Sequence, residues 1–153
     1  MANTYTQISI QLVFAVKYRQ ALITPDFKVT LHKYISGILR NQDQKLLAIN
    51  SMPDHIHIFF GMRPDSNLSD LVRDIKSDSS TFVNEKKLSK QKFRWQDGFG
   101  AFSYSKSQRD RVIKYILNQE QHHAKKTFRE EYFGFLEEFA VDYDEKYVFE
   151  FFD

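Results

Sequence analysis

Two hydrophobic periodicities alternate along this chain, and their order limits the folds that it can adopt. In segment 8–19, apolar residues occupy every second position, which is the spacing of a strand with one buried face. Three further segments read as strands, namely 45–50, 55–62 and 98–105. The short connection between the second and third strands passes through Pro53 and Asp54 and is typical of an antiparallel hairpin.

Helical spacing of apolar residues predicts the remaining elements. Four helices are expected: one opened by Thr24 and Pro25, one over about 68–86, one over about 108–126 that Ser107 and Asp110 can cap, and one opened by a capping box of Thr127 and Glu130. The resulting order is β-α-β-β-α-β-α-α. Its first six elements have the ferredoxin-like split β-α-β pattern, an α+β class in which an antiparallel sheet carries its helices on one face.

The chain contains no linker long enough to divide it, so we expect a single domain over 1–153. The sheet and two helices occupy about 1–105, the third helix about 106–126, and the C-terminal helix with an acidic tail about 127–153. The aromatic and acidic ending "KYVFEFFD" is expected to pack on a neighbour such as another subunit.

The composition excludes several classes of site. The chain has no cysteine, which excludes disulfides, thiolate metal sites and cysteine nucleophiles. No apolar run approaches the roughly 18 residues of a membrane span, and the N-terminus lacks the pattern of a secretory signal. These features predict a soluble protein without a membrane partner, suited to a reducing cytoplasm.

Charge is distributed unevenly along the chain. Residues 130–153 contain nine acidic residues and one basic residue, whereas the preceding part carries 21 basic and 11 acidic residues. A basic body favours a polyanionic partner, although a solvated charged surface explains the same counts.

Two histidines stand one residue apart in the third predicted strand. Alternate residues of a strand point to the same face, so His55 and His57 project together, and Ile56 and Ile58 project to the other face. Two imidazoles at this spacing can chelate one metal ion. Taken alone, the pair is also explained by polar residues on a solvent-facing sheet surface.

A second group of polar residues lies on the third predicted helix. Tyr115 and Gln119 are four residues apart, and His122 and His123 continue the same line one turn later, beside the apolar face. This arrangement suits a groove or cleft. A tyrosine that anchors the helix edge among neutral polar neighbours gives the same pattern.

Together, the two groups indicate phosphodiester chemistry. A tyrosine hydroxyl can attack a phosphodiester and form a covalent phosphotyrosine. A divalent ion held by His55, His57 and a neutral oxygen ligand such as Gln119 would polarise the phosphate and keep positions open for its oxygens. The ligand types favour Mg²⁺ or Mn²⁺, and they are compatible with zinc.

These residues resemble the motifs of the single-tyrosine HUH transposases of the small bacterial insertion-sequence type, the IS200-like family, whose relatives include the REP-associated tyrosine transposases. The segment "DHIHIFF" is similar to the family's two histidines around a bulky hydrophobic residue, and "YILNQ" to its nucleophile and third metal ligand. The segments "LVFAVKYR", "GFGAFSYSKSQ" and "FREEYFGFLEEFAVDYDEKYVF" resemble the family as well. The resemblance therefore covers nearly the whole chain.

The resemblance implies a role for each matched residue. Tyr115 would be the catalytic nucleophile that keeps the 5′ phosphate of the cleaved strand, and His55, His57 and Gln119 would be the metal ligands. It further implies a homodimer that acts on single-stranded DNA with hairpin ends in a bacterial or archaeal cytoplasm. The tyrosine helix would complete the active site of its own or of the other subunit.

Other residues are assigned supporting roles. His122 or His123 is expected to contact DNA, to orient a ligand or to replace one, and Asp54 is expected to hydrogen-bond an imidazole. Phosphate contacts are expected from eight basic residues: Lys17, Arg19, Lys86, Lys87, Lys90, Lys92, Arg94 and Arg109.

Two other functions remain open at this point. One is a hairpin DNA-binding protein of the same fold without transposition activity, although the intact Tyr115 and histidine pair argue against it. The other is a metal-dependent phosphoesterase that uses activated water. A phosphoesterase with two histidine motifs needs a second His-x-Ser/Thr repeat, which this sequence lacks.

Overall fold

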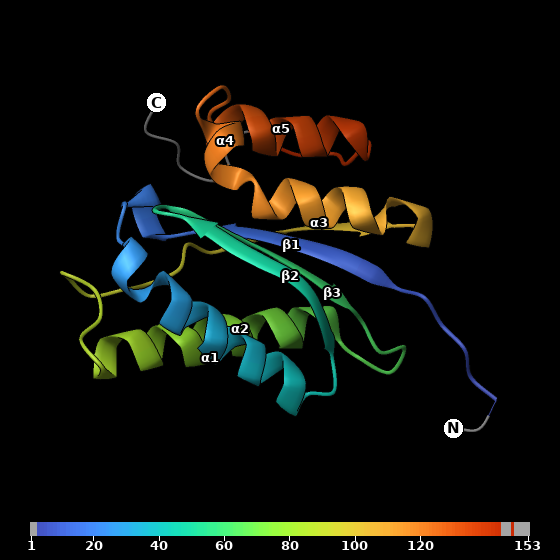
Figure 1. The fold of residues 1–153 in the computed structure, drawn as a ribbon, viewed down its shortest axis with the longest axis horizontal. Coiled ribbons are helices and arrows are strands. Elements are labelled where there is room, and N and C mark those ends of the chain that lie inside the picture. The colour runs from blue at the N-terminus through green and yellow to red at the C-terminus, as the bar shows by residue number, and fades with distance from the viewer. Residues whose placement is uncertain (1–2, 145–147, 149–153) are drawn as a thin grey trace.

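Four strands form one antiparallel sheet in the order β2-β3-β1-β4 (Figure 1). The structure is a computed structural model that describes residues 3–144 and 148. The strands are β1 (Ser9–Ala15), β2 (Lys45–Met52), β3 (His55–Gly61) and β4 (Gly100–Tyr104). Both β1 and β2 pair antiparallel with β3, which lies between them. This is the split β-α-β arrangement that the sequence predicts.

Helices cover both faces of this sheet. The helices of the described residues are α1 (Pro25–Asn41), α2 (Leu68–Glu85), α3 (Arg109–Leu117), α4 (Gln119–His123) and α5 (Phe128–Glu138), with two short 3-10 turns, η1 (Lys17–Arg19) and η2 (Lys106–Gln108). In Figure 1, α1 and α2 lie on one face of the sheet, and α3, α4 and α5 lie on the other. The α+β class is therefore confirmed, and the two helices of the split β-α-β core share one face as predicted.

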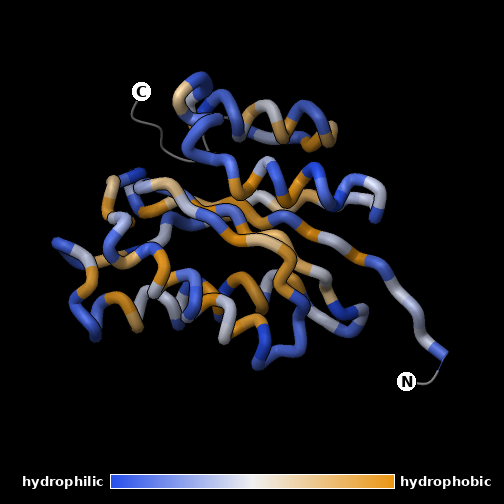
Figure 2. Tube along the Cα trace, viewed as in Figure 1, coloured by the Kyte–Doolittle hydropathy of each residue, from blue (hydrophilic) through white to orange (hydrophobic). Residues whose placement is uncertain are grey.

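The two-sided cover explains why β1 is more buried than its sequence pattern suggests. Every residue of β1 is buried, whereas alternation alone predicts a half-buried strand. In Figure 2 the central strands are mostly orange, and the helices alternate between orange and blue, as expected of helices with one buried face. The expectation of a half-buried strand was wrong because α3 to α5 fold back over the second face.

The register of the strands separates the two faces chemically. Leu12 and Phe14 of β1 lie opposite Ile58 and Ile56 of β3, and all four belong to the large core that includes α1 and α2. The intervening positions of β3 face α3 to α5. There Phe59 joins a smaller apolar cluster with residues of α3, while His55 and His57 are the earlier residues of β3 on this face. The sheet thus presents an apolar face and a partly polar face, and both are buried.

The predicted helix over about 108–126 is broken into two. Asn118 has φ −102° and ψ 25°, which ends α3 and lets α4 start in a new direction. Asn50 of β2 donates its side-chain amide to the Ile116 carbonyl at 2.9 Å, so this carbonyl is bonded to the sheet at the point where α3 ends. The expected capping pair also differs, because the box that opens η2 is formed by Ser105 and Gln108.

The C-terminal helix packs directly against the sheet. Its predicted capping box is confirmed, since Thr127 and Glu130 exchange side-chain and backbone hydrogen bonds. The Tyr132 ring lies so close to Gly100 of β4 that a Cβ atom there would come within 2.8 Å of the tyrosine hydroxyl. The expected packing of the segment "KYVFEFFD" falls mainly outside the described residues. Among the described helices, none is long and apolar enough to cross a membrane.

Candidate active site

His55 and His57 lie on the buried polar face of β3. Their side chains point to the same side as predicted, and they are only 1% and 0% exposed. The alternative explanation, that the two histidines are polar residues on a solvent-facing sheet surface, is therefore wrong. Two fully buried imidazoles need polar partners, and Gln11, Asp54 and Glu131 bond three of their four nitrogens.

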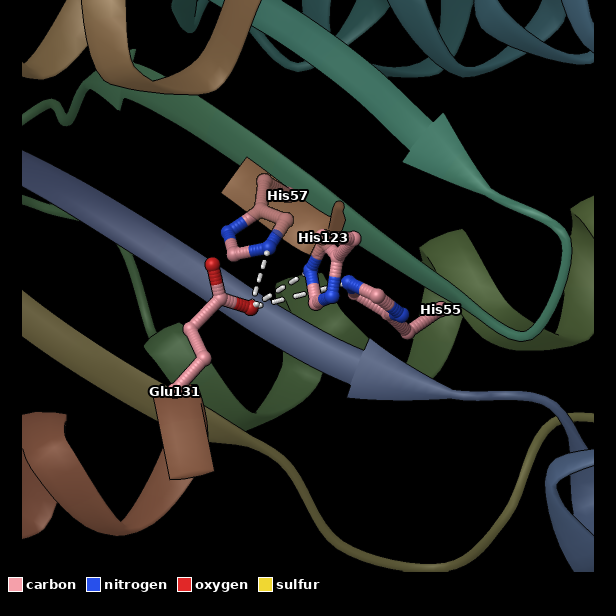
Figure 3. A group of neighbouring side chains, drawn as sticks. All are labelled: His55, His57, His123 and Glu131. Carbon is pink, nitrogen blue, oxygen red and sulfur yellow. Dashed lines mark hydrogen bonds and ion pairs between the residues drawn. The ribbon is translucent and has the colours of Figure 1, made fainter. Parts of the chain in front are cut away.

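Two further residues complete a compact group with the histidine pair (Figure 3). His123 comes from α4 and Glu131 from α5, and one potential ligand atom from each of the four residues lies within 4.8 Å of the others. Glu131 Oε1 is 3.2 Å from His57 Nε2, 3.3 Å from His123 Nε2 and 3.6 Å from His55 Nε2. Three imidazoles and a carboxylate form a donor set that could hold a metal ion.

The outer nitrogens of the histidine pair are held by neighbouring oxygens. His55 Nδ1 is 2.7 Å from Asp54 Oδ1, the kind of contact that the sequence suggests for Asp54, and His57 Nδ1 is 2.8 Å from Gln11 Oε1. Because a carboxylate and an amide oxygen only accept hydrogen bonds, both Nδ1 atoms donate. His55 Nε2, which has no hydrogen-bond partner among the described residues, then carries the lone pair and points into the group, as a metal ligand needs, whereas His57 Nε2 is hydrogen-bonded to the Glu131 carboxylate at 3.2 Å.

The side chain of Tyr115 reaches the same group from α3. Its hydroxyl donates to Glu131 Oε2, and its ring centroid lies 6.1 Å from that of His57. Burial and the negative charge of Glu131 both raise the pKa of the Tyr115 hydroxyl above its usual value. The phenol is therefore protonated in this arrangement, and its proton lies in the hydrogen bond to the Glu131 carboxylate.

Gln119 and the two neighbouring histidines of α4 have different positions. Gln119 is fully buried, and its Oε1 lies 3.1 Å from His123 Nε2. His123 thus contacts both Gln119 and Glu131. His122 does not belong to the four-residue group, and its ring stacks at a tilt on Tyr115 with centroids 4.4 Å apart.

The charge of Glu131 is set by these contacts. Burial by itself raises its pKa, but the contacts with His57, His123 and His55 outweigh burial and hold the pKa well below its usual range. Burial likewise lowers the pKa of His55, which favours the neutral imidazole. The group therefore combines an ionised carboxylate with at least one neutral, unprotonated imidazole nitrogen.

Glu131 has no counterpart among the site residues expected from the sequence. Its signal is nevertheless present, because Phe128, Tyr132 and Phe135 form the buried stripe of α5 and Glu131 falls inside that stripe. An acidic residue in an apolar stripe needs a buried partner. The count of acidic residues over 130–153 does not reveal this position, because it does not separate buried from exposed residues of the helix.

Two cavities of about 270 Å³ approach the group from different sides. The first is lined by residues that include Gln11, Tyr104, Arg111, Tyr115, Lys126 and Glu131. The second is lined by residues that include Arg19, Asp54, His55, His123 and Phe128. The two basic side chains of the first cavity, Arg111 and Lys126, would be close to a phosphate that reached Tyr115 through it.

The basic residues expected to contact phosphates fall into three places. Lys86, Lys87, Lys90, Lys92 and Arg94 are exposed along the segment after α2. This segment reaches the end of β1, where the Lys17 backbone amide donates to the Arg94 carbonyl at 2.8 Å. Arg19 is mostly buried and pairs with Asp54 at 3.1 Å, while Arg109 lies at the start of α3.

Comparisons with known proteins agree on one family. The family described as "Transposase IS200 like" matches residues 4–119. The ISDra2 transposase TnpA of Deinococcus radiodurans is 24% identical over 118 residues, which cover 74% of this chain and 84% of that protein. The family match over residues 4–119 contains Tyr115, Gln119 and the histidine pair, and it ends before His123 and Glu131.

Solved structures of the same kind share the fold. The crystal structure of a protein described as a transposase from D. radiodurans R1 aligns with a TM-score of 0.61 at 24% identity, covering 76% of this chain and 94% of that chain. A REP-associated tyrosine transposase bound to a REP hairpin aligns with a TM-score of 0.60 at 18% identity, covering 79% of this chain and 72% of that chain.

Proposed function

The chain belongs to the IS200-like transposase family, and we propose that it cleaves and rejoins single-stranded DNA through a 5′-phosphotyrosine intermediate formed on Tyr115. One observation carries this proposal. The Tyr115 hydroxyl, expected from the sequence to be the nucleophile, contacts a carboxylate that also contacts all three imidazoles of the buried group. Nucleophile, proton acceptor and metal-ligand types therefore meet at one point.

The proposed reaction uses the residues of this group in two transfers. The Tyr115 oxygen forms a bond to phosphorus and gives its proton to Glu131 Oε2, which releases it to water, while the bond from phosphorus to the 3′ oxygen breaks and that oxygen takes a proton from water. In the second transfer, another 3′ hydroxyl bonds to phosphorus and loses its proton to water, while the bond from phosphorus to the Tyr115 oxygen breaks and that oxygen takes a proton from water. Phosphoester bonds are exchanged one for one, so no external energy source is required.

The donor set fits a divalent cofactor. His55 and His57 would hold the ion, and the family resemblance adds Gln119, whose carboxamide oxygen lies against His123. When bound, Mg²⁺ or Mn²⁺ supplies Lewis-acid polarisation of the scissile phosphate. The residues around it fix the ligands, since Asp54 and Gln11 orient the two imidazoles and Arg19 in turn binds Asp54.

The proposed substrate is single-stranded DNA with hairpin ends, bound by a homodimer. The likeness to a transposase bound to a REP hairpin supports a hairpin, because the two chains share the fold. The exposed basic segment next to the end of β1 would follow the DNA backbone, together with Lys17. Arg19 would act on the site through Asp54, and Arg109, at the start of α3, is a further proposed phosphate contact.

The basic segment leads to a prediction about salt. Affinity for hairpin DNA should fall roughly a hundredfold between 50 and 200 mM salt, if about five phosphates of a single strand are neutralised. Changing Lys86, Lys87, Lys90 and Lys92 to alanine should weaken binding and flatten this dependence. Fluorescence anisotropy across a salt series measures both. The same slope in the quadruple variant and in the wild type would remove the segment from the interface.

The covalent intermediate gives the direct test of the proposed function. The protein is incubated with a labelled single-stranded hairpin DNA and Mn²⁺ or Mg²⁺, and the products are separated on denaturing gels. We expect a labelled protein–DNA adduct that is absent with EDTA. Binding without cleavage would instead favour the hairpin-binding protein, and cleavage without an adduct would favour a phosphoesterase that uses water.

A further inference from the structure

The contacts of Glu131 Oε1 have the spacing of ligands around one ion. Ligand atoms about 2.1 Å from a shared ion lie about 3.0–3.4 Å from each other in octahedral and tetrahedral sites. Glu131 Oε1 lies 3.2 and 3.3 Å from His57 Nε2 and His123 Nε2, and Gln119 Oε1 lies 3.1 Å from His123 Nε2. The contact with His55 Nε2, at 3.6 Å, is slightly wider.

His55 supplies an independent observation. Its Nε2 atom is buried and has no hydrogen-bond partner in the described part of the chain, although its Nδ1 is held firmly by Asp54. A buried, unpartnered nitrogen is costly in a protein interior. Because Nδ1 donates its proton to Asp54, the unpartnered Nε2 carries a lone pair and faces Glu131 and His123. An ion between them would satisfy it.

We propose that His123 and Glu131 are ligands of the same ion as His55 and His57, so that three imidazoles and a carboxylate surround the ion beside Gln119, the ligand that the family resemblance adds. The proposal rests on the metal dependence proposed above and extends it to two residues of α4 and α5. Both residues lie beyond the segment 4–119 that matches the family, and nothing in that match assigns them a role.

The composition of the ligand set narrows the choice of ion. Imidazole nitrogen binds first-row transition ions more strongly than Mg²⁺, which prefers oxygen ligands and keeps its waters. A site with three imidazoles therefore selects Mn²⁺ over Mg²⁺. Glu131 also cancels one unit of the charge of the ion, and its second oxygen remains in contact with the Tyr115 hydroxyl.

The ligands come from three separate parts of the chain. His55 and His57 lie on β3, whereas His123 and Glu131 lie on α4 and α5, which fold back over the sheet. An ion bound by all four residues links these helices to the strand, and it stabilises the folded chain because the unfolded chain has no such site.

The test measures Mn²⁺ binding without DNA. Wild type, Glu131→Gln, His123→Gln and the control Glu137→Gln are titrated with Mn²⁺, and the free ion is followed by electron paramagnetic resonance. Glu137 is an exposed acid of the same helix, so its variant removes the same charge outside the group. We expect one site in the wild type and in Glu137→Gln, an affinity at least about tenfold lower in the other two variants, and Mg²⁺ binding at least tenfold weaker than Mn²⁺.

A second measurement needs no variant. Wild-type crystals grown with Mn²⁺ should give an anomalous peak within bonding distance of Glu131 Oε1 and His123 Nε2.

Before the Mn²⁺ titration described above, circular dichroism establishes that each of the three variants is folded.

Two results would overturn the proposal. The first is an Mn²⁺ affinity of Glu131→Gln equal to that of the wild type. If this variant also cleaves DNA faster, the Glu131 carboxylate lies where the scissile phosphate has to bind and competes with it. The second is a wild type that binds no Mn²⁺. The proposed function is judged separately by the Tyr115 adduct: an adduct with unchanged Mn²⁺ affinity in Glu131→Gln rejects only the ligand role.

Discussion

Replacing Tyr115 with phenylalanine is expected to abolish the covalent protein–DNA adduct and to reduce strand cleavage by at least about a thousandfold. The change removes only the oxygen that would bond to phosphorus. The ring contacts with His57, His122 and Phe135 remain, so the fold should persist. Glu131 loses one donor but keeps its three imidazole contacts, and hairpin binding should change little.

The matched control for this prediction is Tyr132→Phe. Tyr132 is buried on the neighbouring helix α5, next to Glu131 in sequence, and it packs against Gly100 rather than in the group. This variant should still form the adduct. Both variants are compared on denaturing gels with a 5′- or 3′-labelled hairpin, and the adduct should carry the fragment with the 5′ phosphate. Undiminished cleavage by Tyr115→Phe would mean that water is the nucleophile.

The chemistry of β3 could be predicted from the sequence because it depends on local geometry. Alternation along a strand places His55 and His57 on one face and Ile56 and Ile58 on the other, whatever packs on them. The structure follows this division, with the isoleucines in the core beside α1 and α2. Alternation does not predict that α3, α4 and α5 pack on the face that carries His55 and His57. This packing is the reason that the two histidines are buried.

The parts that escaped prediction depend on contacts between distant segments. The end of α3 coincides with a side-chain hydrogen bond from Asn50, which lies 66 positions earlier. Gln119 and His123 both lie on α4, after this break, so the break changes the direction of the two together relative to Tyr115. The pairing of Arg19 with Asp54 is a contact of the same kind, between residues 35 positions apart, and the prediction that Arg19 contacts phosphate stays a prediction. Helical and strand periodicity carry no information on such pairings.

The role of Glu131 in stability can be separated from its role in chemistry. In the absence of metal, His57→Ala removes an imidazole that contacts both Glu131 Oε1 and Gln11 Oε1, so it leaves a buried charge short of a partner. We expect the free energy of unfolding to fall by about 3–5 kcal/mol. Glu131→Gln in the same background removes the charge, and the double variant should be about 1–3 kcal/mol more stable than the sum of the single losses predicts.

Urea unfolding in EDTA, followed by circular dichroism, measures this coupling. As a control, the stability changes of Glu137→Gln and His57→Ala should simply add in the corresponding double variant. Strand cleavage, unlike stability, should not recover in the double variant. His57→Ala and the double variant should both lose strand cleavage by at least about a hundredfold, because the regained stability does not restore the missing imidazole. Strictly additive stabilities would show that the His57–Glu131 contact contributes nothing to the fold. Recovery of cleavage in the double variant would show that His57 only neutralises Glu131, and the metal-binding role of the strand pair would then have to be abandoned.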